Sequence, residues 1–220
     1  MRRVLIIGDS QSQGIGVPLQ NALKAQGDSV TRISRPGYDT KGILKVAKQK
    51  VTDPSKYDLV FVFAGGARTW SPNKADPLKV NVSSVKGLLE YLSPAGDIVW
   101  VGPPPATEIS NLSLAKKIFG SKVRKSDYWF STGTARRRDE KNAIFKARIF
   151  PHATYYDVRD KLVPFPPQGD GIHVKGSAAK LIAKDLTRYP LPASADAFPI
   201  WAVVGVGAVM AFLVWKKQKA

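Results

Sequence analysis

The sequence predicts an α/β fold, a three-layer doubly wound (flavodoxin-like) parallel sheet of five strands, with a transmembrane helix at the C-terminus. Short apolar runs alternate with longer segments of helical periodicity through the first 187 residues, which is typical of parallel sheets with helices on both faces. The chain of 220 residues is long enough for one well-filled domain. The uncharged residues 198–215 do not follow this alternation and are predicted to form a separate segment, the transmembrane helix.

The elements follow from the spacing of apolar residues. Short runs rich in apolar or aromatic residues are typical of strands, and segments of 10 to 13 residues with helical spacing are typical of helices. The predicted strands are residues 4–7, 30–33, 59–63, 98–101 and 154–157. The predicted helices are residues 15–26, 41–50, 80–92, 137–148 and 177–187.

Two regions interrupt this alternation. After the fourth strand, Pro103-Pro104-Pro105 opens an irregular, aromatic stretch that extends to about residue 134, and loops of that length inside a domain are typically functional or partly disordered. Three prolines among small residues in 190–199 indicate a linker. We therefore predict an α/β domain over 1–189, a linker over 190–197, an anchor over 198–215 and a basic tail over 216–220.

The composition limits the chemistry. The chain has no cysteine and two histidines, His152 and His173, so we expect no metal site of the zinc type and no metal or organic cofactor. His152 precedes the fifth predicted strand and is interpreted as structural. The net charge of +17 favours a polyanionic neighbour, such as nucleic acid, an anionic membrane surface or an acidic envelope polymer.

Residues 198–215 have the minimum length for a helix that crosses a bilayer. Trp201 and Trp215 lie near the two ends, and lysines follow, as is common at membrane interfaces. A buried C-terminal helix is the alternative. The charge pattern leaves the topology open, between a tail anchor with the domain inside the cell and a protein in the membrane of a virus particle.

The chemistry-bearing residues lie after the first predicted strand and before the last predicted helix. Gly8-Asp9-Ser10 follows the first strand, and Asp170-Gly171-Ile172-His173 precedes the last helix. A serine hydroxyl becomes a strong nucleophile when an imidazole takes its proton and a carboxylate orients that imidazole. Ser10, His173 and Asp170 are therefore candidate catalytic residues, although serine or aspartate after a strand often only caps the next helix.

Together these blocks resemble the SGNH, or GDSL-type, hydrolases over roughly residues 4–187. The resemblance implies that Ser10 is the nucleophile and that Asp170 and His173 complete the triad. It also implies that the backbone N–H groups of Ser10 and Gly37 bind the oxyanion.

The chain departs from the family after the third strand, where the family has Gly-x-Asn-Asp and this sequence reads Gly65-Gly66-Ala67-Arg68. Ala67 cannot replace the asparagine as an oxyanion donor, and the loss of one such donor costs about 3 kcal/mol of transition-state stabilisation. Arg68 and Asn73 are the nearest candidate substitutes in the sequence.

The resemblance implies a serine esterase, and we expect an acylated carbohydrate or a lipid as substrate, with preference for carbohydrate deacetylation. A catalytically weak or inactive membrane-anchored binding or virion structural protein is the alternative that Ala67 favours. The basic segment 115–148 is either a solvated surface or a contact for an anionic polymer or lipid headgroups. Nucleic-acid binding is a weaker interpretation.

Overall fold

The computed structural model describes residues 1–65, 77–104, 149, 153–161, 174 and 176–189. The chain divides into two units, Met1–Arg188 and Tyr189–Ala220, and all the helices and strands named here belong to the first. The predicted helix 137–148, the linker and the predicted anchor 198–215 lie outside the described residues. Within the described part of the chain, no helix is long and apolar enough to cross a membrane.

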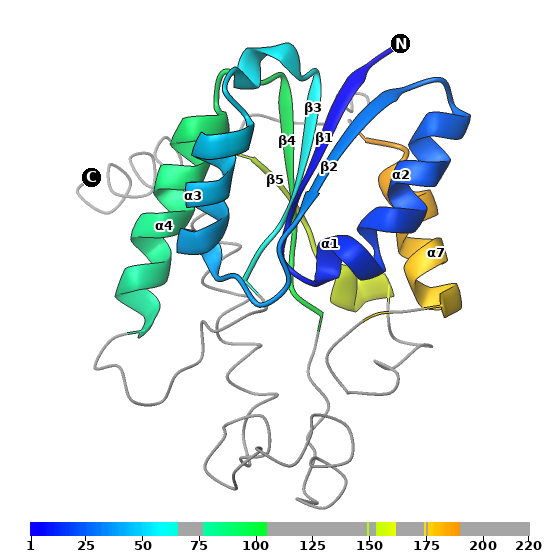
Figure 1. The fold of residues 1–220 in the computed structure, drawn as a ribbon. Helices are drawn as coiled ribbons and strands as arrows, with labels where there is room; N and C mark the ends of the chain where they lie inside the picture. Colours follow the sequence, from blue (N-terminus) through cyan, green and yellow to red (C-terminus); the bar gives the residue numbers. More distant parts are fainter. Residues whose placement is uncertain (66–76, 105–148, 150–152, 162–173, 175, 190–220) are drawn as a thin grey trace, which may run out of the picture. The chain divides into compact units, whose positions relative to one another are not determined.

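The first unit is built on a parallel sheet of five strands, as predicted (Figure 1). The strands are β1 (Arg3–Gly8), β2 (Ser29–Ser34), β3 (Leu59–Phe63), β4 (Asp97–Val101) and β5 (Thr154–Tyr156). Their spatial order is β2-β1-β3-β4-β5, and each neighbouring pair is parallel. Because the order of connection reverses between β1 and β3, the carboxyl ends of these two strands form the switch point at which ligands bind in such sheets.

Helices cover both faces of the sheet (Figure 1). In Figure 1, α3 and α4 lie on one face, whereas α1, α2 and α7 lie on the other. The described helices are α1 (Gln11–Gly14), α2 (Gly16–Ala25), α3 (Thr40–Lys50), α4 (Pro77–Leu92) and α7 (Gly176–Leu186), with 3-10 turns η1 (Pro54–Lys56) and η3 (Val158–Lys161).

Alternate residues of the strands face α3 and α4. Leu5 and Ile7 of β1 and Val60 and Val62 of β3 belong to one buried cluster with Trp100 of β4. The helices contribute Ile43, Ala47, Leu88 and Leu92 to this cluster. Burial of a large apolar side chain contributes about 1.5–3 kcal/mol, so this layer fixes the sheet on which the loops of the site stand.

The helix predicted over 15–26 is α2, Gly16–Ala25, whereas the short α1, Gln11–Gly14, was not predicted. The predicted end of the fifth strand was wrong. The fifth strand ends at Tyr156, and Asp157 lies beyond it. There, the Asp157 carboxylate accepts a hydrogen bond from the Arg159 backbone N–H at 3.1 Å, which turns the chain out of the sheet.

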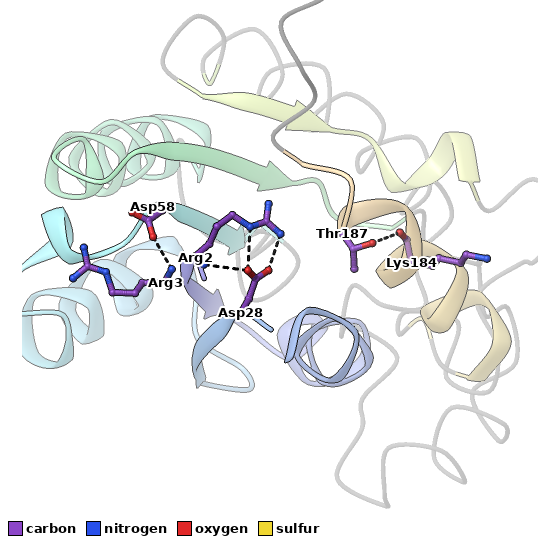
Figure 2. A network of polar contacts seen from close by, with 6 residues as sticks. All are labelled: Arg2, Arg3, Asp28, Asp58, Lys184 and Thr187. Carbon is purple, nitrogen blue, oxygen red and sulfur yellow. Dashed lines mark hydrogen bonds and ion pairs between the residues drawn. The ribbon is translucent and has the colours of Figure 1, made fainter. Parts of the chain in front are cut away.

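The amino ends of the strands are tied together by charged residues (Figure 2). The Arg2 guanidinium donates to the Asp28 carboxylate through two nitrogens, at 3.2 and 2.7 Å. The backbone N–H of Arg3 donates to the Asp58 carboxylate at 2.6 Å. Because the Arg2 hydrogen bond stabilises the ionised form, the pKa of Asp28 lies below its usual value. This edge is opposite the carboxyl ends, so these pairs serve stability.

Candidate functional site

Ser10 lies directly beyond the carboxyl end of β1. It is half-buried, and it occupies the N-cap position of α1 without a capping hydrogen bond from its side chain. The carboxylate of Asp9 instead accepts a hydrogen bond from the Gln11 N–H at 2.9 Å. The side chain that stabilises the start of this helix is therefore that of Asp9.

The backbone of Asp9 binds this turn to β3, the neighbouring strand in the sheet. Asp9 is 1% exposed, and its N–H donates to the carbonyl oxygen of Phe63, the last residue of β3, at 2.8 Å. Its own carbonyl oxygen accepts from the Ser12 N–H at 3.1 Å. Ser10 thus stands at the switch point between β1 and β3, where a ligand is expected.

A second set of polar side chains joins the turn to β2. The Ser12 hydroxyl is fully buried and lies 2.6 Å from the Asp9 carbonyl oxygen and 2.7 Å from the Ser34 hydroxyl. Arg32 donates to the Ser34 hydroxyl at 2.7 Å and to the Gln20 side-chain oxygen at 3.0 Å. Ser12, Ser34 and Arg32 were not among the predicted site residues. Arg32 and Ser34 lie two residues apart, on one face of a strand, but this spacing alone does not distinguish them from an ordinary polar face.

Gly37 lies in a turn beside the end of β1. The Arg35 N–H donates to the Gly8 carbonyl oxygen at 2.8 Å, and the Tyr38 N–H closes the turn by donating to the Arg35 carbonyl oxygen at 3.2 Å. Pro36 and Gly37 are the central residues, and Gly37 has a φ of 76°, as a type II turn requires at its third position. The predicted oxyanion glycine is therefore on the same edge of the sheet as Ser10.

The chain beyond β3 leaves the sheet through Ala64 and Gly65. The indole N–H of Trp100, which is fully buried, donates to the Ala64 carbonyl oxygen at 3.1 Å. Gly65 has a φ of 114°, which few other residues adopt. Trp100 thus holds the start of the segment that differs from the family. The residues beyond it, Ala67, Arg68 and Asn73, lie outside the described residues.

The two other predicted triad residues, Asp170 and His173, also lie outside the described residues, as does His152. The next residue in the chain after His173, Val174, is described and is 1% exposed. Its carbonyl oxygen lies 2.5 Å from the point that a Cβ of Gly14 would occupy. The backbone at Val174 therefore packs closely against the end of α1, the helix that begins directly after Ser10.

The carboxyl end of β5 carries a charge pair of its own. Arg159 donates to both carboxylate oxygens of Asp157, at 2.9 and 2.7 Å. Burial raises the pKa of the neighbouring Tyr155 hydroxyl, and the charge of Asp157 adds to this effect. Within the described part of the chain, no group of three or more His, Asp or Glu residues is arranged to hold a metal ion.

No family model matches the sequence, and no curated protein matches it. Solved structures do match. A lipase/acylhydrolase from Enterococcus faecalis is 18% identical with a TM-score of 0.59, over 86% of this chain and 94% of that chain. A GDSL-like lipase from Bacteroides thetaiotaomicron is 15% identical with a TM-score of 0.61, over 85% of this chain and 86% of that chain.

An acetylxylan esterase from Geobacillus stearothermophilus is also similar, at 16% identity and a TM-score of 0.59, over 85% of this chain and 93% of that chain. Two catalytic mutants of that enzyme match as well, one with a serine and one with an aspartate replaced by alanine. At this level of identity, the likeness shows a shared fold. The five-stranded sheet with Ser10 after its first strand therefore belongs to the fold that these hydrolases share.

Proposed function

Because the chain has the SGNH hydrolase fold, we propose that it is a serine ester hydrolase that acts through an acyl-enzyme. The observation that carries the proposal is the position of Ser10. It follows β1 at the switch point between β1 and β3, and its side chain does not cap α1. A half-buried serine at such a place is well situated to attack a bound ester.

His173 and Asp170 are the proposed base and acid of the triad. The packing of Val174 against Gly14 supports this assignment, because Val174 follows His173 in the chain and Gly14 belongs to the helix that begins directly after Ser10. The catalytic mutants of the acetylxylan esterase, in which a serine or an aspartate is replaced, support a serine and an aspartate as the functional pair. In this role, Asp170 orients the His173 imidazole and stabilises its protonated form.

The reaction proceeds in two steps. His173 removes the proton from the Ser10 hydroxyl, the Ser10 oxygen attacks the ester carbonyl, and His173 returns the proton to the alcohol that leaves. Water then attacks the acyl carbon while His173 removes a proton from the water. His173 returns this proton to the Ser10 oxygen as the bond to the acyl group breaks and the acid leaves. The backbone N–H groups of Ser10 and Gly37 stabilise the oxyanion of both tetrahedral intermediates, and Arg68 or Asn73 takes the place of the missing asparagine.

An acylated carbohydrate is the proposed substrate, with a lipid ester as the second choice. The acetylxylan esterase and the lipases among the similar structures support these two classes. The net charge of +17 favours an acidic polysaccharide or an anionic lipid surface, because it raises the local concentration of anionic partners. We place the enzyme on a membrane, of a cell or of a virus particle, through residues 198–215.

Ala67 favours a second candidate function. If nothing replaces the missing oxyanion donor, the chain is a membrane-anchored binding or virion structural protein that keeps the hydrolase fold. Such a protein would bind an anionic polymer or headgroups through the basic segment 115–148 without turning over an ester.

The test compares the full chain with its Ser10→Ala variant in the hydrolysis of p-nitrophenyl acetate, followed by release of acetate from acetylated xylooligosaccharides and of fatty acid from lysophospholipids. Ser93→Ala is the matched control, because the exposed Ser93 hydroxyl only donates to the Glu90 carbonyl oxygen at the end of α4. We expect turnover by the wild type and by Ser93→Ala, and none above background by Ser10→Ala. Equal rates for all three proteins would favour the binding protein.

A further inference from the structure

The polar side chains behind the Ser10 turn form a continuous series of hydrogen bonds. The Arg32 guanidinium can only donate, so the Ser34 oxygen accepts from it at 2.7 Å. At the other end, the Ser12 hydroxyl donates to the Asp9 carbonyl oxygen at 2.6 Å. The Ser12 hydroxyl has one proton, and its contact with the Asp9 carbonyl oxygen is the shorter of the two, so we assign the 2.7 Å contact between the hydroxyls to the proton of Ser34.

The series of hydrogen bonds therefore runs from Arg32 through Ser34 and Ser12 to the Asp9 carbonyl oxygen. That oxygen belongs to the peptide unit whose nitrogen is the backbone N–H of Ser10. Hydrogen bonds in such a series polarise one another, most strongly where water is excluded. Ser12 is fully buried, and a positive charge at the start of the series increases the effect.

A hydrogen bond to a peptide oxygen draws electron density towards that oxygen and leaves the N–H of the same peptide more positive. We infer that Arg32, Ser34 and Ser12 are positioning residues that polarise the Asp9–Ser10 peptide and so strengthen the Ser10 N–H as an oxyanion donor. The inference rests on the proposed function, in which this N–H stabilises the oxyanion. It also gives this chain a source of positive potential where the family asparagine is replaced by Ala67.

The placement of Arg32 fits this role. Its Nε donates to the Gln20 side chain on α2 at 3.0 Å, which fixes the guanidinium beside Ser34. Among the residues that the structure describes, Arg32 forms no ion pair with a carboxylate. No carboxylate in the described part of the structure offsets the positive charge of Arg32 beside the Ser34 hydroxyl. The charge of Arg2, in contrast, is compensated by Asp28.

The test measures kcat and KM for p-nitrophenyl acetate with the full chain. The variants are Ser34→Ala, which breaks the series, Ser34→Thr, which keeps the hydroxyl, Arg32→Met, and the double variant Ser34→Ala with Arg32→Met. We expect Ser34→Ala and Arg32→Met each to lower kcat about three- to tenfold, since part of one oxyanion donor is lost, with KM nearly unchanged. Ser34→Thr should restore kcat, and the double variant should be no slower than either single variant.

A second readout does not depend on turnover. The amide proton of Ser10 should move to lower chemical shift in Ser34→Ala and return in Ser34→Thr. An unchanged kcat in Ser34→Ala and Arg32→Met, with an active wild type, would overturn this inference and leave the proposed function intact. Equal rates for wild type and Ser10→Ala would overturn the proposed function, and the Ser10 amide shift alone would then decide whether the peptide is polarised.

Discussion

The carbonyl oxygen of Val174 lies 2.5 Å from the point that a Cβ of Gly14 would occupy. Both partners are constrained, because Gly14 ends α1 and Val174 is 1% exposed. Because it is a backbone atom, the Val174 oxygen cannot move away from an added Cβ by rotation of a side chain. The contact therefore couples the helix after Ser10 to the segment that enters α7.

Gly14→Ala should displace this segment and reduce esterase activity more than stability. We expect kcat/KM for p-nitrophenyl acetate to fall by about tenfold or more, because a shift of about 1 Å in a catalytic group is costly. Gly87→Ala in α4 is the matched control, since its Cβ would meet only the flexible end of Leu44 at 3.2 Å. If Gly14→Ala keeps the activity of the wild type, Val174 does not position the base.

Arg2→Gln should lower the free energy of unfolding by about 1 kcal/mol at neutral pH, because it removes a partly exposed ion pair. The pKa of Asp28 is lower in the folded state than in the unfolded chain. The stabilisation is therefore complete above the unfolded pKa of about 3.9 and is lost as the pH falls through the folded pKa.

Denaturant titrations of wild type and Arg2→Gln should accordingly converge below about pH 4. Arg3→Gln is the control with the same loss of charge, because the contact of Arg3 with Asp58 uses its backbone N–H. If the effect of Arg2→Gln is the same at pH 3 and pH 7, the stabilisation does not come from the ionised Asp28.

Trp100→Phe should destabilise the fold by about 1–3 kcal/mol, since it leaves the buried Ala64 carbonyl oxygen without its indole donor. Because Ala64 precedes the segment with Gly65 and Ala67, we also expect lower kcat at temperatures where the variant is fully folded. Thermal unfolding and the rate at 10–20 °C below the midpoint separate the two effects. Loss of stability alone would show that Trp100 does not support the site.

Ala67→Asn should raise kcat. The resemblance to SGNH hydrolases implies that an asparagine at this position donates to the oxyanion, and one such donor contributes about a hundredfold or more. We expect a gain of about tenfold, because Arg68 or Asn73 supplies part of the effect in the wild type. Ala67→Ser is the comparison with a shorter donor. A slower Ala67→Asn would indicate that the site is built around a different donor.

The sheet could be predicted because its three inner strands, β1, β3 and β4, are almost entirely buried. The run Leu59–Phe63 was predicted with the bounds that the structure shows, since no polar residue interrupts it. The helix α1 could not be predicted, because Gln11–Gly14 contains no apolar residue and the apolar pattern begins only at Ile15. The short α1 carries no periodic signal of its own.

The positions of two candidate site residues in the fold could be predicted from the strands that they follow. Ser10 and Gly37 follow strands that were correctly placed, so the parallel sheet brings them to one edge. Arg32 and Ser34 could not be identified, because alternating polar residues on the edge strand β2 have the pattern of an ordinary solvated face. Their connection to Ser12 depends on tertiary packing, which no spacing within one element reveals.

Covalent labelling of the nucleophile tests the assignment of Ser10 most directly. The full chain is treated with diethyl p-nitrophenyl phosphate, which phosphorylates activated serines, and its peptides are analysed by mass spectrometry. We expect one diethylphosphoryl group on Ser10 in the wild type, and none when His173→Ala removes the base. Labelling of another residue, or no labelling of a folded wild type, would contradict the assignment of Ser10 as the nucleophile.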